Sequence, residues 1–430
     1  MKSGFAASPQ AAVLRNPRFL KLFTGQIISL LGDSVAYMGL SFLILYRLGG
    51  SALDVGKLMI AATIPTLVLG PIAGVFVDRW SRRRVMIVAD VVRALIYAAM
   101  PLVSSLNLVY AGVFCASVMS RFFYPAKSAI IPNLVEPDQL MVASGLNQTS
   151  GSIVAILGPA VGGALAGTLG PGIALYANAA SFLLSAILIA AIRLDETHAG
   201  AATNQAAADQ TASARGGVGA IWRQLLQGFR FIAGNRAARF YTGMFALFML
   251  CVGGVNVLFP PFAKDVLGMD IRMIGIADSA QAVGGLAGGI IVTVIATRFR
   301  PARMIFTSVV GTGIVLAAFG LNRSIPAAYA LTAATGVLLS AVNIPFSGEM
   351  MRLIPNDLRG RVWAAFGSAV DGCSLISMGV MPAIAVAAGL PPVIVAMGLA
   401  VAGLGLIALA LSGRVMAGSA ASPAGATPAA

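Results

Sequence analysis

The sequence predicts an all-α membrane protein with twelve transmembrane helices arranged as two six-helix halves. Of the 430 residues, 58% are hydrophobic and only 10% are charged, whereas about 25% of the residues of an ordinary soluble domain are charged. Twelve apolar stretches are long enough to cross a bilayer, which needs about 20 residues per helix. A polar segment separates these stretches into two groups of six.

The predicted spans follow one another closely within each half. They cover residues 19–47, 54–77, 84–106, 108–127, 138–169, 171–193, 236–266, 272–299, 301–321, 324–352, 358–389 and 390–412. Several are longer than a bilayer requires, which indicates tilt or extension beyond the lipid. The 49 glycines favour close packing of such helices.

The polar segments complete the predicted domain organisation. We expect an N-terminal six-helix bundle over residues 1–193, a cytoplasmic linker over 194–235, a C-terminal six-helix bundle over 236–412 and a disordered tail over 413–430. Late in the linker, apolar residues recur at helical spacing beside two arginines: Trp222, Leu225, Leu226, Phe229 and Ile232 beside Arg223 and Arg230. This pattern is typical of an amphipathic helix on the membrane surface.

The cations predict the orientation of the chain. An even number of spans places both termini on one side, and most of the 29 lysines and arginines fall on that side. Four flank the spans on the opposite side: Arg47, Lys264, Arg272 and Arg323. Cationic loops stay in the cytoplasm, so we expect both termini there. The same rule accounts for the net charge of +14 without a nucleic-acid partner.

The two halves also repeat each other in sequence. Residues before, in and after the second span recur 219 positions later: Gly49, Gly56, Gly70, Arg79 and Arg84 match Gly268, Gly275, Gly289, Arg298 and Arg303. Duplicated halves of the same orientation are typical of transporters that rock two bundles about a central site.

The loop after the second span, from Gly74 to Arg84, combines a glycine, an Asp-Arg pair and a basic cluster. It resembles the signature loop of the major facilitator superfamily, with Ser81 where that family usually has glycine. The resemblance implies the twelve-helix major facilitator fold and a cytoplasmic gate motif formed by Gly74, Asp78, Arg79, Arg82, Arg83, Asp90 and Arg93. The alternative is that the basic cluster only determines the orientation of the chain in the membrane.

The fifth span carries a second motif of small residues and proline: Gly151, Gly158, Pro159, Gly162 and Gly163. It is similar to the motif of the drug–proton antiporter branches of the superfamily. Close packing of a bent helix is the alternative explanation.

Two further stretches resemble one branch of the superfamily, the macrolide-efflux and enterobactin-exporter group. These are the junction from Phe122 to Val135 and the segment from Gln227 to Phe231. Gly32 and Asp33 in the first span resemble the same group. The resemblance implies a multi-pass protein of the bacterial inner membrane.

Ionisable residues inside the spans are candidates for proton coupling because each is costly to place in lipid. Asp33 lies mid-span without a cation one turn away, and a carboxyl group in apolar surroundings can exchange a proton. Arg121, Asp371 and Asp278 are the other candidates. A structural carboxyl group is the alternative for Asp33, and extension of the side chain toward the interface is the alternative for Arg121.

The candidates for the substrate cavity are neutral polar and aromatic residues of the spans: Tyr37, Gln148, Asn256, Phe259, Gln281 and Asn343. A cavity with few charges suits a lipophilic or amphipathic molecule. Three isolated cysteines and a single histidine, His198 in the linker, offer no metal site. We therefore expect no cofactor and expect the proton gradient to supply the energy.

The sequence favours a monomeric secondary transporter that exports a small amphipathic compound, such as an antibiotic, dye or siderophore, by proton antiport and alternating access. A lipid or lysophospholipid flippase, or an uptake carrier of the same fold, is the alternative. An enzyme is disfavoured because the chain lacks a nucleotide-binding loop, a serine-nucleophile elbow and a zinc-protease motif.

Overall fold

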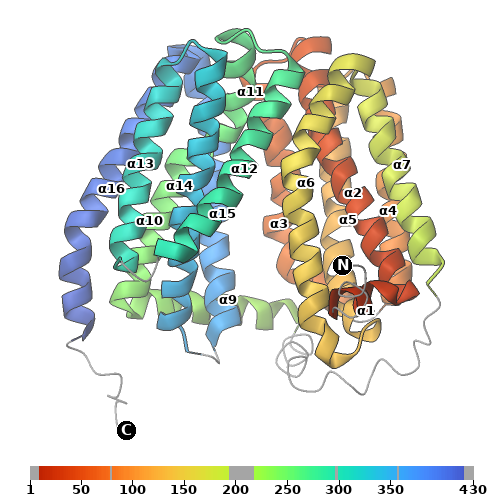
Figure 1. Cartoon of the computed structure of the whole chain (residues 1–430), viewed down its shortest axis with the longest axis horizontal. Coiled ribbons are helices and arrows are strands. Elements are labelled where there is room, and N and C mark those ends of the chain that lie inside the picture. Colours follow the sequence, from red (N-terminus) through yellow and green to blue (C-terminus); the bar gives the residue numbers. More distant parts are fainter. Residues whose placement is uncertain (1–8, 78–79, 193–216, 296–298, 356–357, 421–430) are drawn as a thin grey trace, which may run out of the picture. The chain divides into compact units, whose positions relative to one another are not determined.

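The computed structural model describes residues 9–77, 80–192, 217–295, 299–355 and 358–420 (Figure 1). Throughout these residues the chain forms helices joined by short loops, and no strand occurs in them. Within the same residues, 12 helices are long and apolar enough to cross a membrane. This confirms the predicted all-α membrane fold.

The helices of the first half begin with a short α1 (Pro9–Arg15) and continue through six spans. The spans are α2 (Pro17–Phe42) with the π-helical turn η1 (Leu43–Arg47), α3 (Ala52–Val77), α4 (Arg82–Ala99) with η2 (Met100–Leu102), α5 (Leu106–Ile130) with η3 (Ile131–Asn133), α6 (Leu140–Leu169) preceded by η4 (Pro137–Gln139), and α7 (Pro171–Ala190). The third span ends at Leu102 rather than residue 106, and the fourth continues to Asn133 rather than ending at 127. Pro125 lies inside α5 without ending it.

The second half begins with α9 (Gly217–Gly234), which occupies the last part of the predicted linker. Its spans are α10 (Arg236–Val252) with α11 (Val255–Asp265), α12 (Ile271–Ile295), α13 (Pro301–Leu321), α14 (Ile325–Leu353), α15 (Arg359–Ala388) and α16 (Leu390–Ala420). The predicted tail from residue 413 lies partly in α16, and its remainder, together with linker residues 194–216, lies outside the described residues.

Two compact units make up the chain. The first contains residues 1–221 together with Ala263–Ser279, and the second contains Trp222–Phe262 together with Ala280–Ala430. The start of α12 therefore belongs to the first unit and the rest of α12 to the second. The domain boundaries at residues 193 and 236 stay predictions.

The internal repeat is visible in the backbone. Four glycines have positive φ, and they form two pairs separated by 219 residues: Gly49 (63°) with Gly268 (66°), and Gly170 (89°) with Gly389 (87°). Such angles are readily adopted only by glycine. Helix packing repeats as well, since α2 contacts α6 and α7 in the first half as α10 contacts α15 and α16 in the second.

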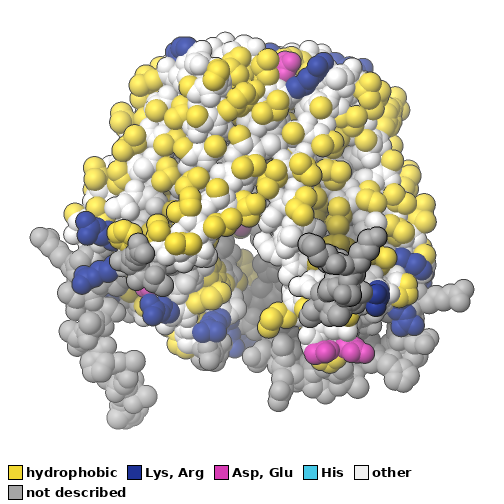
Figure 2. Space-filling view, in the orientation of Figure 1, with side chains coloured by type: hydrophobic (Ala, Val, Ile, Leu, Met, Phe, Trp, Pro, Cys, Tyr) yellow, Lys and Arg dark blue, Asp and Glu magenta, His cyan; other side chains and the backbone are white. Residues whose placement is uncertain are grey.

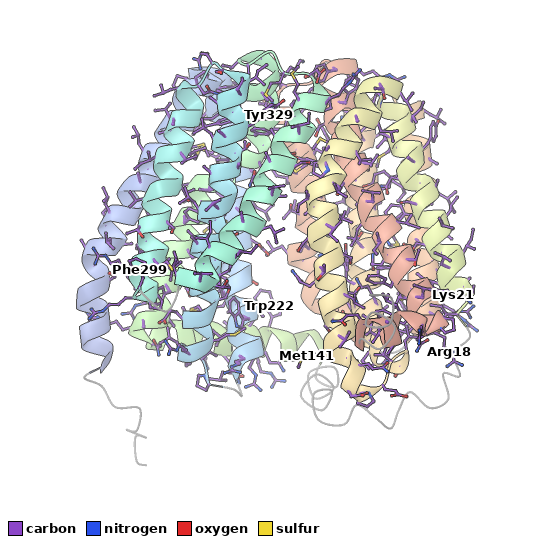
Figure 3. All side chains as sticks on the ribbon, viewed as in Figure 1. Arg18, Lys21, Met141, Trp222, Phe299 and Tyr329 are labelled. Atoms are coloured by element: carbon purple, nitrogen blue, oxygen red, sulfur yellow. The ribbon has the colours of Figure 1, made fainter. Side chains whose placement is uncertain are left out.

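Hydrophobic side chains cover the flanks of both units, and lysine and arginine gather near the ends of the spans (Figure 2). In the first unit, Arg18 and Lys21 lie at the lower end of α2 (Figure 3). In the second unit, aromatic side chains fill the interior, where the Phe245 and Phe346 ring centroids are 4.4 Å apart. Apolar flanks with cations at the ends are the surface that a bilayer requires.

Candidate functional site

A cavity of about 250 Å³ lies inside the first unit, among α2, α3, α4, α5 and α7. Its polar lining consists of Asp33, Tyr37, Arg93, Tyr97, Ser117, Ser120 and Arg121. The remaining lining is apolar, and includes Leu58, Met59 and Phe182. An apolar wall with a few converging polar groups is typical of a small-molecule site.

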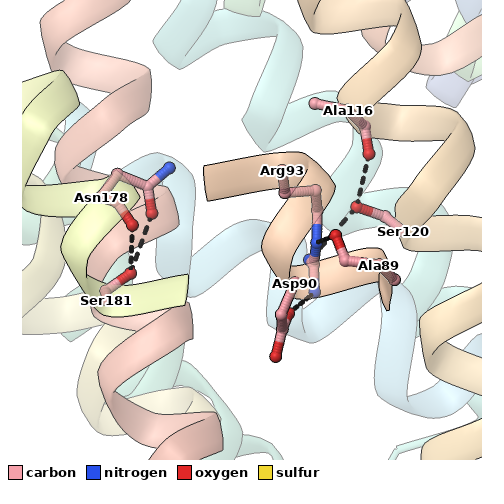
Figure 4. Close-up of polar contacts among 7 residues, drawn as sticks. All are labelled: Ala89, Asp90, Arg93, Ala116, Ser120, Asn178 and Ser181. Carbon is pink, nitrogen blue, oxygen red and sulfur yellow. Dashed lines mark hydrogen bonds and ion pairs between the residues drawn. The ribbon is translucent and has the colours of Figure 1, made fainter. Parts of the chain in front are cut away.

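Arg93 of α4 is the most tightly held of the polar side chains and is 2% exposed. Its guanidinium forms an ion pair with Asp90 one turn earlier and also donates to the Ser120 hydroxyl at 3.4 Å (Figure 4). The rings of Phe123 and Phe182 lie 4.6 Å and 4.2 Å from its central carbon. These contacts fix the orientation of a buried cation by pairing, hydrogen bonding and cation–π attraction.

Asp33 of α2 lies beside α7 because the residue before it is glycine. A β-carbon on Gly32 would come within 2.8 Å of the Ser181 β-carbon, so only glycine allows α7 to approach this closely. The approach brings the Asn178 side chain next to the Asp33 carboxyl group. The Asn178 side-chain oxygen accepts a hydrogen bond from Ser181, at 3.1 Å, which leaves its NH₂ group available to Asp33.

Arg121 of α5 lies on the same cavity wall but is held differently from Arg93. Its central carbon is 5.5 Å from the centre of the Tyr124 ring. Its Nε is buried and has no acceptor among the residues that the structure describes. The guanidinium of Arg121 is thus available to a group that enters the cavity.

The fixed charges around the cavity balance. Asp33 and Asp90 contribute two negative charges when both are ionised, and Arg93 and Arg121 contribute two positive charges. Because Arg93 is committed to Asp90, protonation of Asp33 changes the net charge of the cavity and leaves the buried ion pair intact. A proton and a cationic ligand group would therefore compete for the same carboxylate.

The predicted gate residues fall into three sets. Gly74, Asp78 and Arg79 lie outside the residues whose side chains the structure describes. Arg82 donates to the Ala129 carbonyl at 2.8 Å, and Arg83 donates to the carbonyl of Ile189 at 3.2 Å, so both tie the start of α4 to neighbouring helices. Asp90 and Arg93 form the third set, since the structure places Arg93 on the cavity with Asp33.

The motif of the fifth span packs α6 against two helices at once. A β-carbon on Gly162 would lie 2.8 Å from the Val35 α-carbon, and one on Gly158 would lie 2.5 Å from the Ser34 β-carbon, both in α2. On the adjoining face, Gly163 lies against the Ile271 carbonyl of α12, where the distance would be 2.7 Å. The Pro159 carbonyl approaches Gly275, and the following amide donates to Ser279 at 3.1 Å. Gly151, in contrast, has open space around it.

The other predicted candidates do not line this cavity. Asp278 of α12 belongs to the first unit and is close enough to Tyr37 for the two side chains to interact electrostatically. Gln148 is exposed on α6. Four candidates and Asp371 belong to the second unit: Asn256, Phe259, Gln281 and Asn343. Among them, Phe259 packs on Phe319 at 5.6 Å, and Asn343 donates to the Leu339 carbonyl of its own helix at 2.8 Å.

The chain matches the family model described as the Major Facilitator Superfamily over residues 22–378. The chain belongs to this superfamily. It is therefore a multi-pass membrane protein of a transporter family, as its twelve spans already indicate.

Three named transporters illustrate what this superfamily member is similar to in sequence. It is 25% identical over 356 residues to the MFS-type transporter YkuC of Bacillus subtilis, covering 81% of both chains. It is 26% identical over 417 residues to the multidrug efflux pump Tap of Mycolicibacterium fortuitum, covering 92% of this chain and 96% of that protein. It is 24% identical over 361 residues to the macrolide efflux protein A of Streptococcus pyogenes, covering 82% of this chain and 85% of that protein.

A solved structure supports the fold independently. A mutant of the nucleoside transporter NupG superposes with a TM-score of 0.74, covering 92% of this chain and 100% of that one, at 14% sequence identity. At that identity the likeness shows the fold alone. The resemblance to the superfamily and its macrolide-efflux branch, inferred from the motifs, is confirmed by the family model and by the macrolide efflux relative.

Sequence reasoning did not single out Tyr97, Ser120, Asn178 and Phe182 as parts of the site. Asn178 carried a usable signal, because it is the one amide in the strongly apolar stretch of α7 from Pro171 to Ala190. A buried amide inside a span needs a partner. Its neighbour Asp33 lies far away in sequence, so only the packing of α7 on α2 brings the two side chains together.

Proposed function

We propose that this transporter exports a lipophilic or amphipathic molecule from the cytoplasm in exchange for protons, with Asp33 as the proton-carrying residue. The observation that carries the proposal is the placement of Asp33 on a largely apolar cavity whose neighbouring Arg93 is already paired with Asp90. Asp33 is then the cavity carboxyl group whose charge can change without breaking the buried ion pair. The names of Tap and the macrolide efflux protein support an efflux direction.

The proposed cycle follows from competition at one carboxylate. A substrate that enters from the cytoplasm binds best when Asp33 is ionised. The amine or other electropositive group of the substrate then faces the negative charge of the carboxylate. When the cavity opens to the other side, a proton neutralises Asp33 and weakens substrate binding. The proton leaves when the cavity faces the cytoplasm again, and the gradient thereby drives net export.

The apolar lining and the volume constrain the substrate. A cavity of about 250 Å³ accommodates part of a drug-sized molecule, and Met59 and Phe182 offer it polarisable and aromatic surface. The Arg121 guanidinium supplies a donor for a carbonyl or hydroxyl oxygen of the same molecule. An amphipathic compound with one basic group and several hydrogen-bond acceptors fits these features. The proton gradient supplies the energy for its transport, and no cofactor takes part.

The test uses inverted membrane vesicles that hold a proton gradient reported by a pH-sensitive dye. We expect a macrolide or a lipophilic cation to collapse the gradient in vesicles with the wild-type protein and not in vesicles with Asp33→Asn. Glu349→Gln is the matched control, since Glu349 pairs with Arg352 at 3.3 Å in α14, a helix that does not line the cavity. It should behave like the wild type.

Each other outcome has a definite meaning. Equal collapse in Asp33→Asn and wild type would show that the proton uses another carboxyl group, and Asp278 or Asp371 would replace Asp33. Transport of the compound without any effect on the gradient would overturn antiport and retain export. If no compound in the panel moves, reconstituted vesicles with fluorescent lysophospholipids test the flippase alternative.

A further inference from the structure

Helix α9, before the seventh span, has one face that docks on its own unit. Gly228 is buried, and a β-carbon there would collide with the Arg361 carbonyl of α15. Ile232, one turn later, is 6% exposed and packs into the interior of the unit. Arg361 also donates to the Gln227 side chain at 2.9 Å. These contacts fix α9 to the start of α15.

An adjoining face of α9 carries large apolar side chains that the unit does not cover. Trp222 is 60% exposed, Leu226 48% and Phe229 36%. These residues are spaced by four and three positions, so they share one face of the helix. Arg223 and Arg230, seven residues apart and both exposed, form the edge of that face. The described part of α9 contains no acidic residue.

The direction of α9 suits a membrane surface. It runs across the lower end of α10 and α15 rather than along them (Figure 1). A helix that crosses the ends of spans lies parallel to the bilayer, at the level of the lipid headgroups. Trp222 and Phe299 lie toward this end of the second unit, whereas Tyr329 lies toward the other end (Figure 3).

The cations of the second unit gather at the same end as α9. Besides the two arginines of α9, they are Arg236, Arg239, Arg300, Arg303, Arg352, Arg359 and Arg361. Of the cations described in this unit, Arg323 alone lies at the other end, between α13 and α14. An excess of cations marks the side that faces an anionic leaflet.

We propose that the face of α9 formed by Trp222, Leu226, Phe229, Arg223 and Arg230 binds the headgroup region of acidic phospholipids. The three apolar side chains enter the boundary between headgroups and acyl chains, and the two arginines pair with lipid phosphates. An acidic protein surface would match the arginines equally well. The bilayer is favoured because the helix lies crosswise at the ends of membrane spans, the level at which lipid headgroups are found.

The proposal is independent of the substrate and of proton coupling. The expected consequence is a lipid preference of α9: its exposed face binds a leaflet rich in acidic lipid more strongly than a zwitterionic leaflet. Each arginine near such a surface adds to the electrostatic attraction for acidic lipid. The preference of this face for acidic over zwitterionic lipid should therefore depend on both Arg223 and Arg230.

The test measures Trp222 fluorescence in the purified full chain reconstituted into bilayers. Phosphatidylglycerol or phosphatidylcholine brominated near the headgroup end of the acyl chains serves as the quencher. The chain has three tryptophans, so the difference between wild type and Trp222→Phe isolates the signal of Trp222. Because Trp222 is exposed, this substitution does not disturb the interior of the protein.

We expect both brominated lipids to quench Trp222, with brominated phosphatidylglycerol effective at a lower mole fraction. The double substitution Arg223→Gln/Arg230→Gln should remove most of that preference, whereas Arg323→Gln should leave it unchanged. Quenching by aqueous iodide in place of brominated lipid would show that the face meets water and would overturn the proposal. Protection from both quenchers would indicate that protein covers the face, and would overturn it equally.

Discussion

Arg93 shows what a charged residue requires inside a membrane bundle. The sequence places Asp90 and Arg93 one turn apart, which predicts a pair. It cannot show that Phe123 of α5 and Phe182 of α7 enclose the guanidinium, because these residues come from helices distant in sequence. The resemblance to the superfamily assigned the pair to the cytoplasmic gate, which stays a prediction, and the structure places Arg93 on the cavity.

Removal of Arg93 should destabilise the protein strongly. Asp90 is fully buried, and Arg93→Gln would leave its carboxylate unpaired, which typically costs about 3–5 kcal/mol. The expected result is a large drop in the melting temperature of the detergent-solubilised protein. The double variant Asp90→Asn/Arg93→Gln removes both charges and should recover much of the loss.

The comparison of single and double variants tests the pairing itself. If Arg93→Gln alone melts like the wild type, the ion pair carries no stability and Arg93 is free to serve another partner. If the double variant is no more stable than the single one, the loss comes from the stacking of Arg93 between Phe123 and Phe182 instead.

At the scale of elements, the packing of α6 accounts for the small residues of its motif. Sequence reasoning weighed an antiporter signature against plain close packing. In the structure, Gly158 and Gly162 allow α2 to approach α6 closely, and Gly163 allows the same for the start of α12. The sequence indicated the small residues correctly, but it could not assign them to two neighbours because the helices that pack on α6 follow from the three-dimensional fold.

This arrangement predicts a sharp contrast between two glycines of one helix. Gly163→Ala would force a methyl group to within 2.7 Å of the Ile271 carbonyl, so α6 and α12 must separate. Overpacking of this kind costs typically about 1–3 kcal/mol. Gly151→Ala is the matched control, because nothing lies within 4 Å of its added methyl group. Thermal melting and transport rates should fall for the first variant and not for the second. Equal behaviour of both variants would show that the approach of α12 to α6 is not required.

At the scale of the whole molecule, the repeat was the most predictable property. The shared offset of Gly49 and Gly268 in the sequence corresponds to nearly equal φ angles in the structure. Gly170 and Gly389 extend the repeat to the last helix pair, where flanking residues differ too much for the sequence to show it. Apart from the ends of the third and fourth spans, the described spans lie close to their predicted positions because hydropathy marks them in the sequence.

The position of the cavity in the first unit could not be predicted from the repeat. Charged residues occur in both halves, and both Asp33 and Asp371 are candidates for proton coupling from the sequence. The cavity in the first unit brings Asp33 together with Arg93 and Arg121, which lie on three different helices. Such convergence depends on the rotation of each helix about its axis, and hydropathy does not determine that rotation.

The distribution of cations further predicts the orientation of the whole chain, with both termini in the cytoplasm. Two exposed loop residues test it: Glu136 between α5 and α6, and Ser324 between α13 and α14. Each is changed to cysteine in a chain whose Cys115, Cys251 and Cys373 are replaced by serine. A membrane-impermeant maleimide should label Ser324→Cys in intact cells, and Glu136→Cys only after the membrane is opened. The reverse pattern would invert the orientation and, with it, the export direction. Labelling of both from outside would contradict the span count, because five spans separate the two loops.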